Sequence, residues 1–278
     1  MIPIGIVTRN RHQYLDITLR SLSATDLPDD QHLVVYDDAS DDEDTLAYLY
    51  SDQTISTACD LPINDVWKKD LHLKDVAPRE EAPGLKGKVQ VHLVGDKPVG
   101  VFNASCRAIL RLWEDYEDSV KRNGLVLIQD DVVFCPQWLK KLKSASTKVK
   151  RYTPKPGLLC GMQLNMAGIG KKPNPHLWPR KGITAQCYYF TPHGLQRVRP
   201  FLAKWHKHKK GFDNKMCAAV RTHGAGVYLM NPAVCQHIGV VSLVRPGWNW
   251  RWKSKKGRVG YQSHGPFPMA DEIREFQS

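Results

Sequence analysis

The first 135 residues alternate between short apolar runs, typical of buried strands, and segments whose apolar residues recur at helical spacing. Strands are predicted at 2–7, 32–36, 89–94 and 125–128, and helices at 14–22, 39–48 and 101–113. This alternation is typical of βαβ units, which build a parallel sheet with helices on its faces. The predicted fold class is therefore α/β with a parallel, doubly wound sheet. Residues 51–88 show no clear periodicity and are interpreted as a mostly irregular insertion with some helix.

The chain changes in character after Pro136. Strands are predicted there at 158–163, 185–190, 227–230 and 234–237, and helices at 138–146, 192–202 and 213–222. There is no internal repeat or low-complexity tract, and the tail from Arg245 is basic and aromatic. We therefore expect a single domain over 1–278, with a nucleotide-type half over 1–135 and an acceptor-type half over 136–278.

Charge divides the chain at the same point. Residues 1–135 hold 14 Lys and Arg against 24 Asp and Glu, a net −10, whereas residues 136–278 hold 26 against 4, a net +22. A half this basic favours a polyanion or an anionic surface over a neutral metabolite. Much of the charge lies in two runs, 204–210 and 248–258, and the second interleaves three tryptophans with five cations. Such aromatics can stack on bases or sugars; a solvated basic face, or tryptophans packed on the core, is the alternative.

Cysteine usage predicts the compartment. The seven cysteines are scattered and form no C-x-x-C pair, which argues for reduced thiols and against a disulfide framework or zinc ribbon. The N-terminal apolar run is too short for a signal peptide, and no run approaches the length of a membrane span. We expect a cytoplasmic protein, in the host cytoplasm if it is viral.

Paired aspartates follow two of the predicted strands, Asp37-Asp38 after HLVVY and Asp130-Asp131 after LVLIQ. Ligands of parallel sheets bind at the carboxyl ends of the strands, so both pairs are expected to line one site. Carboxylates after an apolar strand suit Mg²⁺ or Mn²⁺, which then bridges to phosphates. The alternative for each pair is a turn or cap, and Ser40 and Asp41 would cap a helix after the first pair.

Four segments in register carry a resemblance to a known family. IPIGIVTRNRHQYLDITLRSL, VVYDDASDD, GVFNASCRAIL and LVLIQDDVVFCPQWL resemble the nucleotide-sugar half of the GT-A glycosyltransferases, family 2-like. The resemblance implies a Rossmann-type half joined to an acceptor-binding half. The metal motif of the family reads D-x-D or E-D-D, and here it is Gln129-Asp130-Asp131. The resemblance therefore implies Asp131 as a metal ligand and Asp130 as part of the donor site, with an amide at the first position.

The stretch PAVCQHIGVVS resembles P-x-x-x-Q-H-x-G-x-x-S of some inverting N-acetylglucosaminyltransferases. In metal-dependent GT-A enzymes a late histidine often completes the metal site, and the resemblance assigns that role to His237. A neutral imidazole is a good Mn²⁺ ligand. The alternative is a buried histidine at a strand end.

Asp213 is the only acidic residue between Asp131 and Asp271. The resemblance implies that it is the catalytic base, because inverting GT-A enzymes place theirs at such a position. A base must take the proton of the acceptor hydroxyl as that oxygen attacks the anomeric carbon. The alternative is a helix N-cap.

The resemblance also implies contacts with the donor. The loop that contains Thr8 and Arg11 approaches the nucleotide in this family, and an arginine there suits a diphosphate. Arg107 matches an arginine of the central helix near the sugar and phosphates, and Asp37 and Asp38 would bind the nucleoside. An exposed polar loop and a solvated helix face are the alternatives.

Together these features predict an inverting, metal-dependent hexosyltransferase that uses a nucleotide-diphosphate sugar, a UDP-sugar such as UDP-glucose, with Mn²⁺ or Mg²⁺. The basic half favours DNA as the acceptor, with bacteriophage enzymes that glycosylate 5-hydroxymethylcytosine and related pyrimidines as the precedent; the target base would be flipped out of the duplex. The alternatives are a bacterial glycosyltransferase acting on lipopolysaccharide or capsular glycan at an anionic membrane, and a non-catalytic nucleic-acid-binding module. No obligate protein partner is expected.

Overall fold

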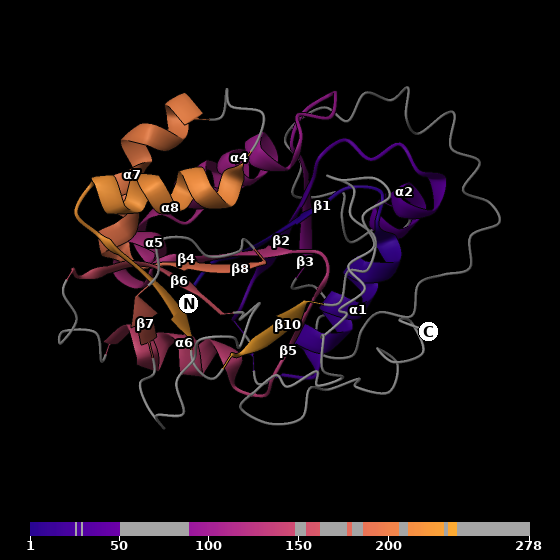
Figure 1. Ribbon diagram of the computed structural model, residues 1–278. Helices are drawn as coiled ribbons and strands as arrows, with labels where there is room; N and C mark the ends of the chain where they lie inside the picture. Colours follow the sequence, from indigo (N-terminus) through magenta and orange to yellow (C-terminus); the bar gives the residue numbers. More distant parts are fainter. Residues whose placement is uncertain are drawn as a thin grey trace, which may run out of the picture.

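The computed structural model describes residues 1–25, 27–28, 30–50, 89–147, 154–161, 177–179, 186–205, 211–230 and 233–237 (Figure 1). The strands are β1 (Ile4–Thr8), β2 (Leu33–Asp37), β3 (Val89–Leu93), β4 (Leu125–Gln129), β5 (Val132–Phe134), β6 (Pro156–Cys160), β7 (Leu177–Pro179), β8 (Cys187–Phe190), β9 (Gly226–Met230) and β10 (Cys235–His237). The helices are α1 (His12–Ser23), α2 (Glu43–Tyr50), α4 (Val101–Asp115), α5 (Glu117–Asn123), α6 (Trp138–Thr147), α7 (Pro192–Trp205) and α8 (Phe212–Thr222). The predicted insertion 51–88, Asp271 and the basic segments 206–210 and 248–258 lie outside these residues.

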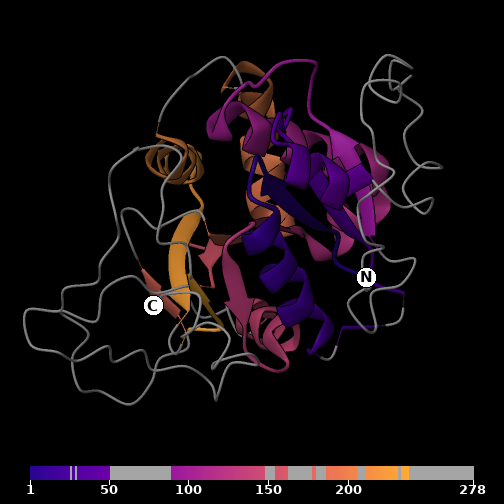
Figure 2. The same cartoon turned by 90° about the vertical axis from the view of Figure 1, so that its right-hand side faces the viewer.

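The first half forms the parallel sheet that its alternating pattern predicts. β1 pairs in parallel with both β2 and β4, and β2 pairs in parallel with β3, which gives the order β3-β2-β1-β4. The interior strands β1, β2 and most of β4 are buried along their length, as expected of continuous apolar runs. Helices lie on both faces: α4 and α7 on one and α1 and α6 on the other (Figures 1 and 2). The prediction of an α/β, doubly wound fold is confirmed.

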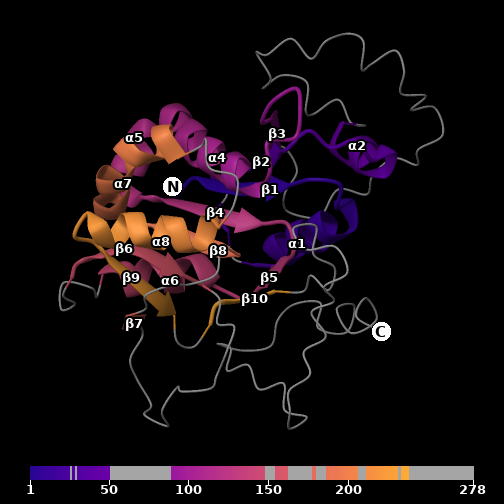
Figure 3. The same cartoon turned by 45° about the horizontal axis from the view of Figure 1, so that its top comes forward.

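The second half extends the same sheet but changes the direction of its strands. Beyond β4 the order continues β8-β6-β9-β7, and β8 runs antiparallel to both β4 and β6. The parallel arrangement is therefore limited to the first half and to the β6–β9 pair. A separate antiparallel ribbon of β5 and β10 lies beside α1 (Figure 3). β5, β7 and α5 were not predicted.

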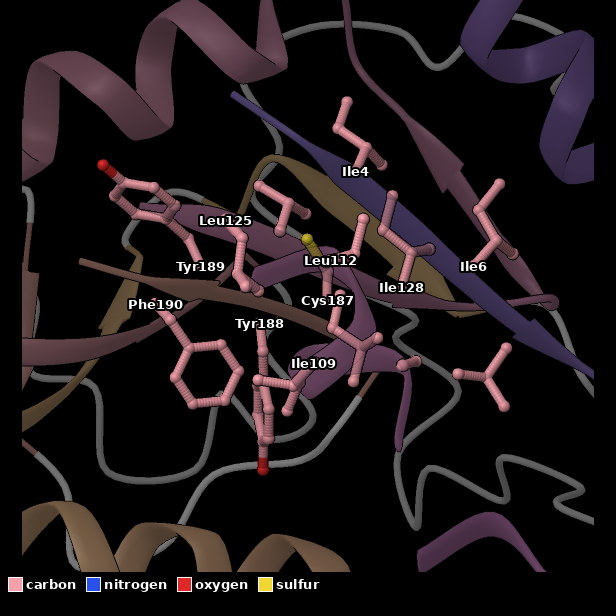
Figure 4. Packing of buried hydrophobic residues seen from close by; sticks show 14 of the residues in the cluster. Ile4, Ile6, Ile109, Leu112, Leu125, Ile128, Cys187, Tyr188, Tyr189 and Phe190 are labelled. Carbon is pink, nitrogen blue, oxygen red and sulfur yellow. The ribbon is translucent and has the colours of Figure 1, made fainter. Parts of the chain in front are cut away.

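The core spans both halves of the sheet. On β8, Tyr188 and Phe190 point toward the α4 side while Cys187 and Tyr189 point to the opposite face, as strand alternation requires (Figure 4). Tyr188 packs edge to face on Phe190, with ring centroids 5.8 Å apart. Because β8 pairs with both β4 and β6, its buried side chains belong to a core that is shared by the two halves.

All six cysteines in the described part of the chain are buried, and none of these six forms a disulfide bond. Within the same part of the chain, no helix combines the length and apolarity needed to cross a bilayer.

Candidate functional site

The candidate site lies where the parallel sheet reverses its strand order. From β1 the chain moves outward through β2 and β3, and then returns to place β4 on the other side of β1. Helix α1, which follows β1, and helix α4, which precedes β4, cover opposite faces of the sheet (Figure 1). The loops that follow β1 and β4 therefore meet at a topological switch point, the position at which open α/β sheets bind their ligands. The predicted residues Thr8, Arg11, Asp130 and Asp131 all lie here.

Asp130 is held by the loop that follows β1. Its side chain is almost fully buried; Thr8 Oγ1 donates a 2.8 Å hydrogen bond to Oδ2 and Arg11 Nη1 donates a 2.9 Å bond to Oδ1. Thr18 Oγ1 on α1 donates to the main-chain oxygen of Asp130 and accepts from the amide of Val132. Hydrogen bonds to both the side chain and the main chain of Asp130 therefore fix the turn between β4 and β5.

Asp131 is brought to His237 by the register of the ribbon. β5 begins directly after Asp131, and its first residue, Val132, pairs with His237 at the end of β10. His237 Nε2 consequently lies 3.0 Å from Asp131 Oδ2, although 106 positions separate the two residues. Arg11 Nη2 lies 2.7 Å from the same oxygen. The other oxygen of Asp131, Oδ1, is buried and has no hydrogen-bond partner among the described residues.

The pKa values of the two neighbouring carboxyls are shifted in opposite directions. Burial raises the pKa of Asp130, and the charge of Asp131 adds to this effect, against the opposing influence of Arg11. Burial also acts to raise the pKa of Asp131, but His237 and Arg11 together outweigh it and hold that pKa below its usual range. Asp131 is therefore the carboxylate that stays ionised and available to a cation.

The other acidic pair is engaged by neutral donors. Asp37 Oδ1 accepts hydrogen bonds from the amide and the hydroxyl of Ser40, and Oδ2 accepts one from Tyr50 Oη. Burial raises the pKa of Asp37 despite these bonds. The two oxygens of Asp38 accept hydrogen bonds of 2.8 Å from the backbone amides of Val99 and Gly100. Asp38 therefore anchors the start of α4. The predicted nucleoside contacts of Asp37 and Asp38 stay predictions.

Asp213 lies in the first turn of α8. The N-cap is Gly211, whose φ is +76°, so Asp213 is inside the helix and the N-cap alternative does not apply. Phe212 packs edge to face on Phe102, the second residue of α4, with ring centroids 5.6 Å apart. Since α4 begins beyond the carboxyl end of β3, Asp213 is at the same edge of the sheet as the other predicted residues. Burial, and then the charge of Asp213, raise the pKa of Tyr188 well above its usual value.

Two further residues of the motifs have mainly backbone contacts. Arg107 is on the exposed face of α4, and its Nη1 donates a 2.9 Å hydrogen bond to the main-chain oxygen of Val94 in the loop after β3. Gln129 is the last residue of β4, and its backbone N–H donates a hydrogen bond to the main-chain oxygen of Gln186. A donor contact by Arg107 stays a prediction.

The sequence analysis did not identify two residues that shape this site. The ring of Tyr14 lies under the guanidinium of Arg11, 4.2 Å from its centre. Thr18 makes the two hydrogen bonds that fix the β4–β5 turn. The signal for Thr18 was present, because it is a hydroxyl residue on the apolar face of α1, between Leu15 and Leu22.

Comparison with known proteins identifies the architecture. No protein-family model and no curated protein matches the chain. Among solved structures, S. aureus TarS 1-349 matches with a TM-score of 0.50 and 14% identity, over 84% of this chain and 60% of that one. GalNAc-T7, solved with UDP, GalNAc and Mn²⁺, matches with a TM-score of 0.50 and 11% identity, over 85% of this chain and 43% of that one. Both are GT-A glycosyltransferases.

The chain has the GT-A fold. It spans about three fifths of the TarS structure and less than half of the GalNAc-T7 structure. At these identities the likeness establishes the fold alone. A fold hosts many functions, so the function depends on the residues of the site.

Proposed function

We propose that this protein is an inverting, metal-dependent glycosyltransferase that moves a hexose from a UDP-sugar to a hydroxymethyl group on DNA. The observation that carries the proposal is the 3.0 Å contact between Asp131 and His237 at the switch point of a GT-A sheet. A donor of this class has precedent among proteins with the fold, since GalNAc-T7 was solved with UDP and Mn²⁺.

The residues at the switch point fit a divalent cation. Asp131 offers an ionised carboxylate with a buried, unpartnered oxygen, and His237 offers an imidazole nitrogen; both are ligands that Mn²⁺ accepts. No group of three or more such side chains forms a ready cage in the described residues. Asp131 and His237 would therefore hold the ion as a pair, with the donor diphosphate supplying further oxygens. When bound, the ion offsets the negative charge of the leaving diphosphate.

Asp213 is proposed to act as the base. The acceptor oxygen attacks the anomeric carbon, the bond from that carbon to the phosphate oxygen breaks, and Asp213 takes the hydroxyl proton. A single direct displacement inverts the configuration at the anomeric carbon. As the only carboxylate between Asp131 and Asp271, Asp213 has no nearby substitute within its own half.

DNA is the acceptor that the charge distribution favours. The second half has a net charge of +22, and cations that neutralise phosphates gain affinity by counterion release. In the described part of that half, Lys140, Lys143, Lys204 and Arg221 are exposed. The two basic runs, 204–210 and 248–258, lie largely outside the described residues.

The proposal is tested by transfer to defined acceptors. The protein is incubated with mixed nucleotide sugars, Mn²⁺ and DNA that contains 5-hydroxymethylcytosine, and the digested nucleosides are weighed by mass spectrometry. We expect a nucleoside heavier by one hexose, absent with EDTA and absent from DNA that lacks the hydroxymethyl group. Binding to this DNA should weaken steeply with salt, with a log–log slope of about −0.9 per phosphate contact.

The rival acceptor gives a different result in the same assay. A glycosyltransferase that works on lipopolysaccharide or capsular glycan would bind anionic vesicles and leave hydroxymethylated DNA unmodified with every donor. Salt-insensitive binding to DNA would also count against the DNA acceptor. Hexose transfer to a glycan would support the transferase activity but show that the acceptor is a glycan instead of DNA.

A further inference from the structure

Arg11 lies against the acidic pair to which the predicted metal would bind. Its guanidinium contacts both acidic residues of the site, with Nη1 2.9 Å from Asp130 Oδ1 and Nη2 2.7 Å from Asp131 Oδ2. The oxygen of Asp131 that it contacts is also the one that faces His237. The Arg11 side chain is only 14% exposed, so this pairing takes place almost out of contact with water.

The charges explain why an arginine is held there. Two adjacent buried carboxylates repel each other and lose hydration, so they need a cation close by. Arg11 supplies one positive charge to this pair, and the effect is mutual: burial acts to lower the pKa of Arg11, yet Asp130 and Asp131 raise it above its usual value. The guanidinium and the carboxylates therefore stabilise each other in the absence of any other cation.

A divalent ion on Asp131 would compete with this arrangement. It would carry twice the charge of the guanidinium, and it would repel Arg11 across a distance of a few ångströms. The Arg11 side chain can leave α1 at the cost of its cation–π contact with Tyr14. It makes no side-chain cap for that helix, and the bond from the Leu15 amide goes to its main-chain oxygen. Its planar fork of donors would then suit the oxygens of a diphosphate.

We infer that Arg11 is an exchangeable counter-cation: it pairs with Asp130 and Asp131 in the metal-free protein and moves to the donor diphosphate when a divalent ion takes Asp131. The inference rests on the proposed function, because it assigns the released guanidinium to a nucleotide-diphosphate donor. It makes Arg11 a positioning residue that links metal entry to donor binding.

The test measures Mn²⁺ alone on the full chain. Free Mn²⁺ is titrated by electron paramagnetic resonance with the wild type, Arg11→Gln and Arg9→Gln. Arg9 is the matched control, since it belongs to the same loop and contacts Asp41 at 3.8 Å instead of the carboxylate pair. Removing one positive charge near the ion should tighten Mn²⁺ binding roughly tenfold in Arg11→Gln. Arg9→Gln should bind Mn²⁺ as the wild type does.

UDP binding in the presence of Mn²⁺ should change in the opposite direction. Arg11→Gln loses a charged hydrogen-bond donor to the diphosphate, so its UDP affinity should fall about tenfold. Tighter Mn²⁺ with weaker UDP is a combination that general damage to the fold would not produce. Arg11→Lys guards against a failure of Arg11→Gln to fold: it keeps the charge but cannot reach both carboxylates, and its Mn²⁺ affinity should exceed that of the wild type.

Mn²⁺ binding by Arg11→Gln and Arg11→Lys that is unchanged or weaker than wild type would overturn the inference, as would the absence of Mn²⁺ binding in every protein. The result is separable from the transferase assay. Tighter Mn²⁺ binding and weaker UDP binding in Arg11→Gln, without hexose transfer by the wild type, would support the exchange of Arg11 and contradict the proposed transferase function. Hexose transfer by the wild type, with no change of Mn²⁺ affinity in the Arg11 variants, would support the transferase function and contradict the exchange.

Discussion

The two acidic pairs of this protein look alike in sequence and differ in their partners. Asp37-Asp38 and Asp130-Asp131 each follow an apolar strand of the parallel half, and all four residues are buried. The first pair accepts hydrogen bonds from hydroxyls and backbone amides. The second pair faces the guanidinium of Arg11 and the imidazole of His237.

This difference separates fixed carboxylates from exchangeable ones. Hydrogen bonds to the backbone amides of a helix start cannot be replaced without moving the helix, so Asp38 is tied to α4. A side-chain cation such as Arg11 can be replaced by another cation, because its guanidinium moves on flexible bonds. The position of an acidic pair at a strand end is therefore insufficient to predict a metal site; the charge of its partners decides.

The largest effect should come from removing the negative charge of Asp131 in the second pair. Asp131→Asn keeps the shape of the side chain and should abolish hexose transfer, since several kcal/mol of stabilisation by the ion corresponds to about 10³-fold in rate. The fold should survive because Asp130 still pairs with Arg11. Initial rates with added Mn²⁺ measure the change. Asp16→Asn, which removes an aspartate from an exposed ion pair with Arg20, is the control. Near-normal transfer by Asp131→Asn would end the metal assignment.

Asp213 is a carboxylate that belongs to neither pair. If it is the base, Asp213→Asn should retain UDP binding and lose transfer by about 10²–10⁴-fold. Single-turnover rates and calorimetric titration of UDP separate these two quantities. Retention of most of the rate would reduce Asp213 to a helix-start carboxylate, and loss of activity only through unfolding would lead to the same conclusion.

The sequence predicted the parallel half well because β1, β2 and β4 are almost continuous apolar runs. β3 (VQVHL) alternates apolar with polar residues, which is also a strand pattern. It missed β5, which has three residues and is stabilised by pairing with β10, about 100 positions later. It missed β7, which is also three residues long and ends in Pro179. It missed α5 because Val120 is the only buried residue of that helix, so no apolar periodicity exists.

For the site, the sequence indicated which residues gather but not how they pair. Strand-end positions and the family resemblance bring Asp131 and His237 to one place, and the ribbon register explains the contact. The direction of the Arg11 side chain could not be predicted. Arg11 follows β1 at a loop position from which its long side chain could reach either solvent or Asp130, and only the fold decides between them.

A third test weakens the fixed pair. Asp38→Asn leaves one oxygen for the amides of Val99 and Gly100 and removes a negative charge from the start of α4. The free energy of unfolding should fall by about 1–2 kcal/mol, as measured by urea denaturation. If Asp38 also binds the nucleoside, UDP affinity in the folded variant should fall too. A stability equal to that of the wild type would mean that the Asp38 anchor is dispensable.

The smallest effect concerns the backbone that follows each pair. After Asp131 the chain continues extended into β5, whereas after Asp38 it turns through Ala39, whose φ is +52°. A left-handed alanine costs roughly 1–2 kcal/mol, and glycine at that position loses about 0.4–1 kcal/mol through the greater freedom of the unfolded chain. Ala39→Gly should therefore leave the stability unchanged or raise it slightly.

Ala218 in the helix α8 is the matched control for that change. Its φ is not positive, so Ala218→Gly has no left-handed strain to relieve, and it should destabilise the protein by about 1 kcal/mol. Urea midpoints of the two variants give the comparison directly. Equal losses in both would show that Ala39 carries no strain, and would point to the hydrogen bonds of Asn10 with Ser40, Asp41 and Asp42 as what holds the turn after Asp38.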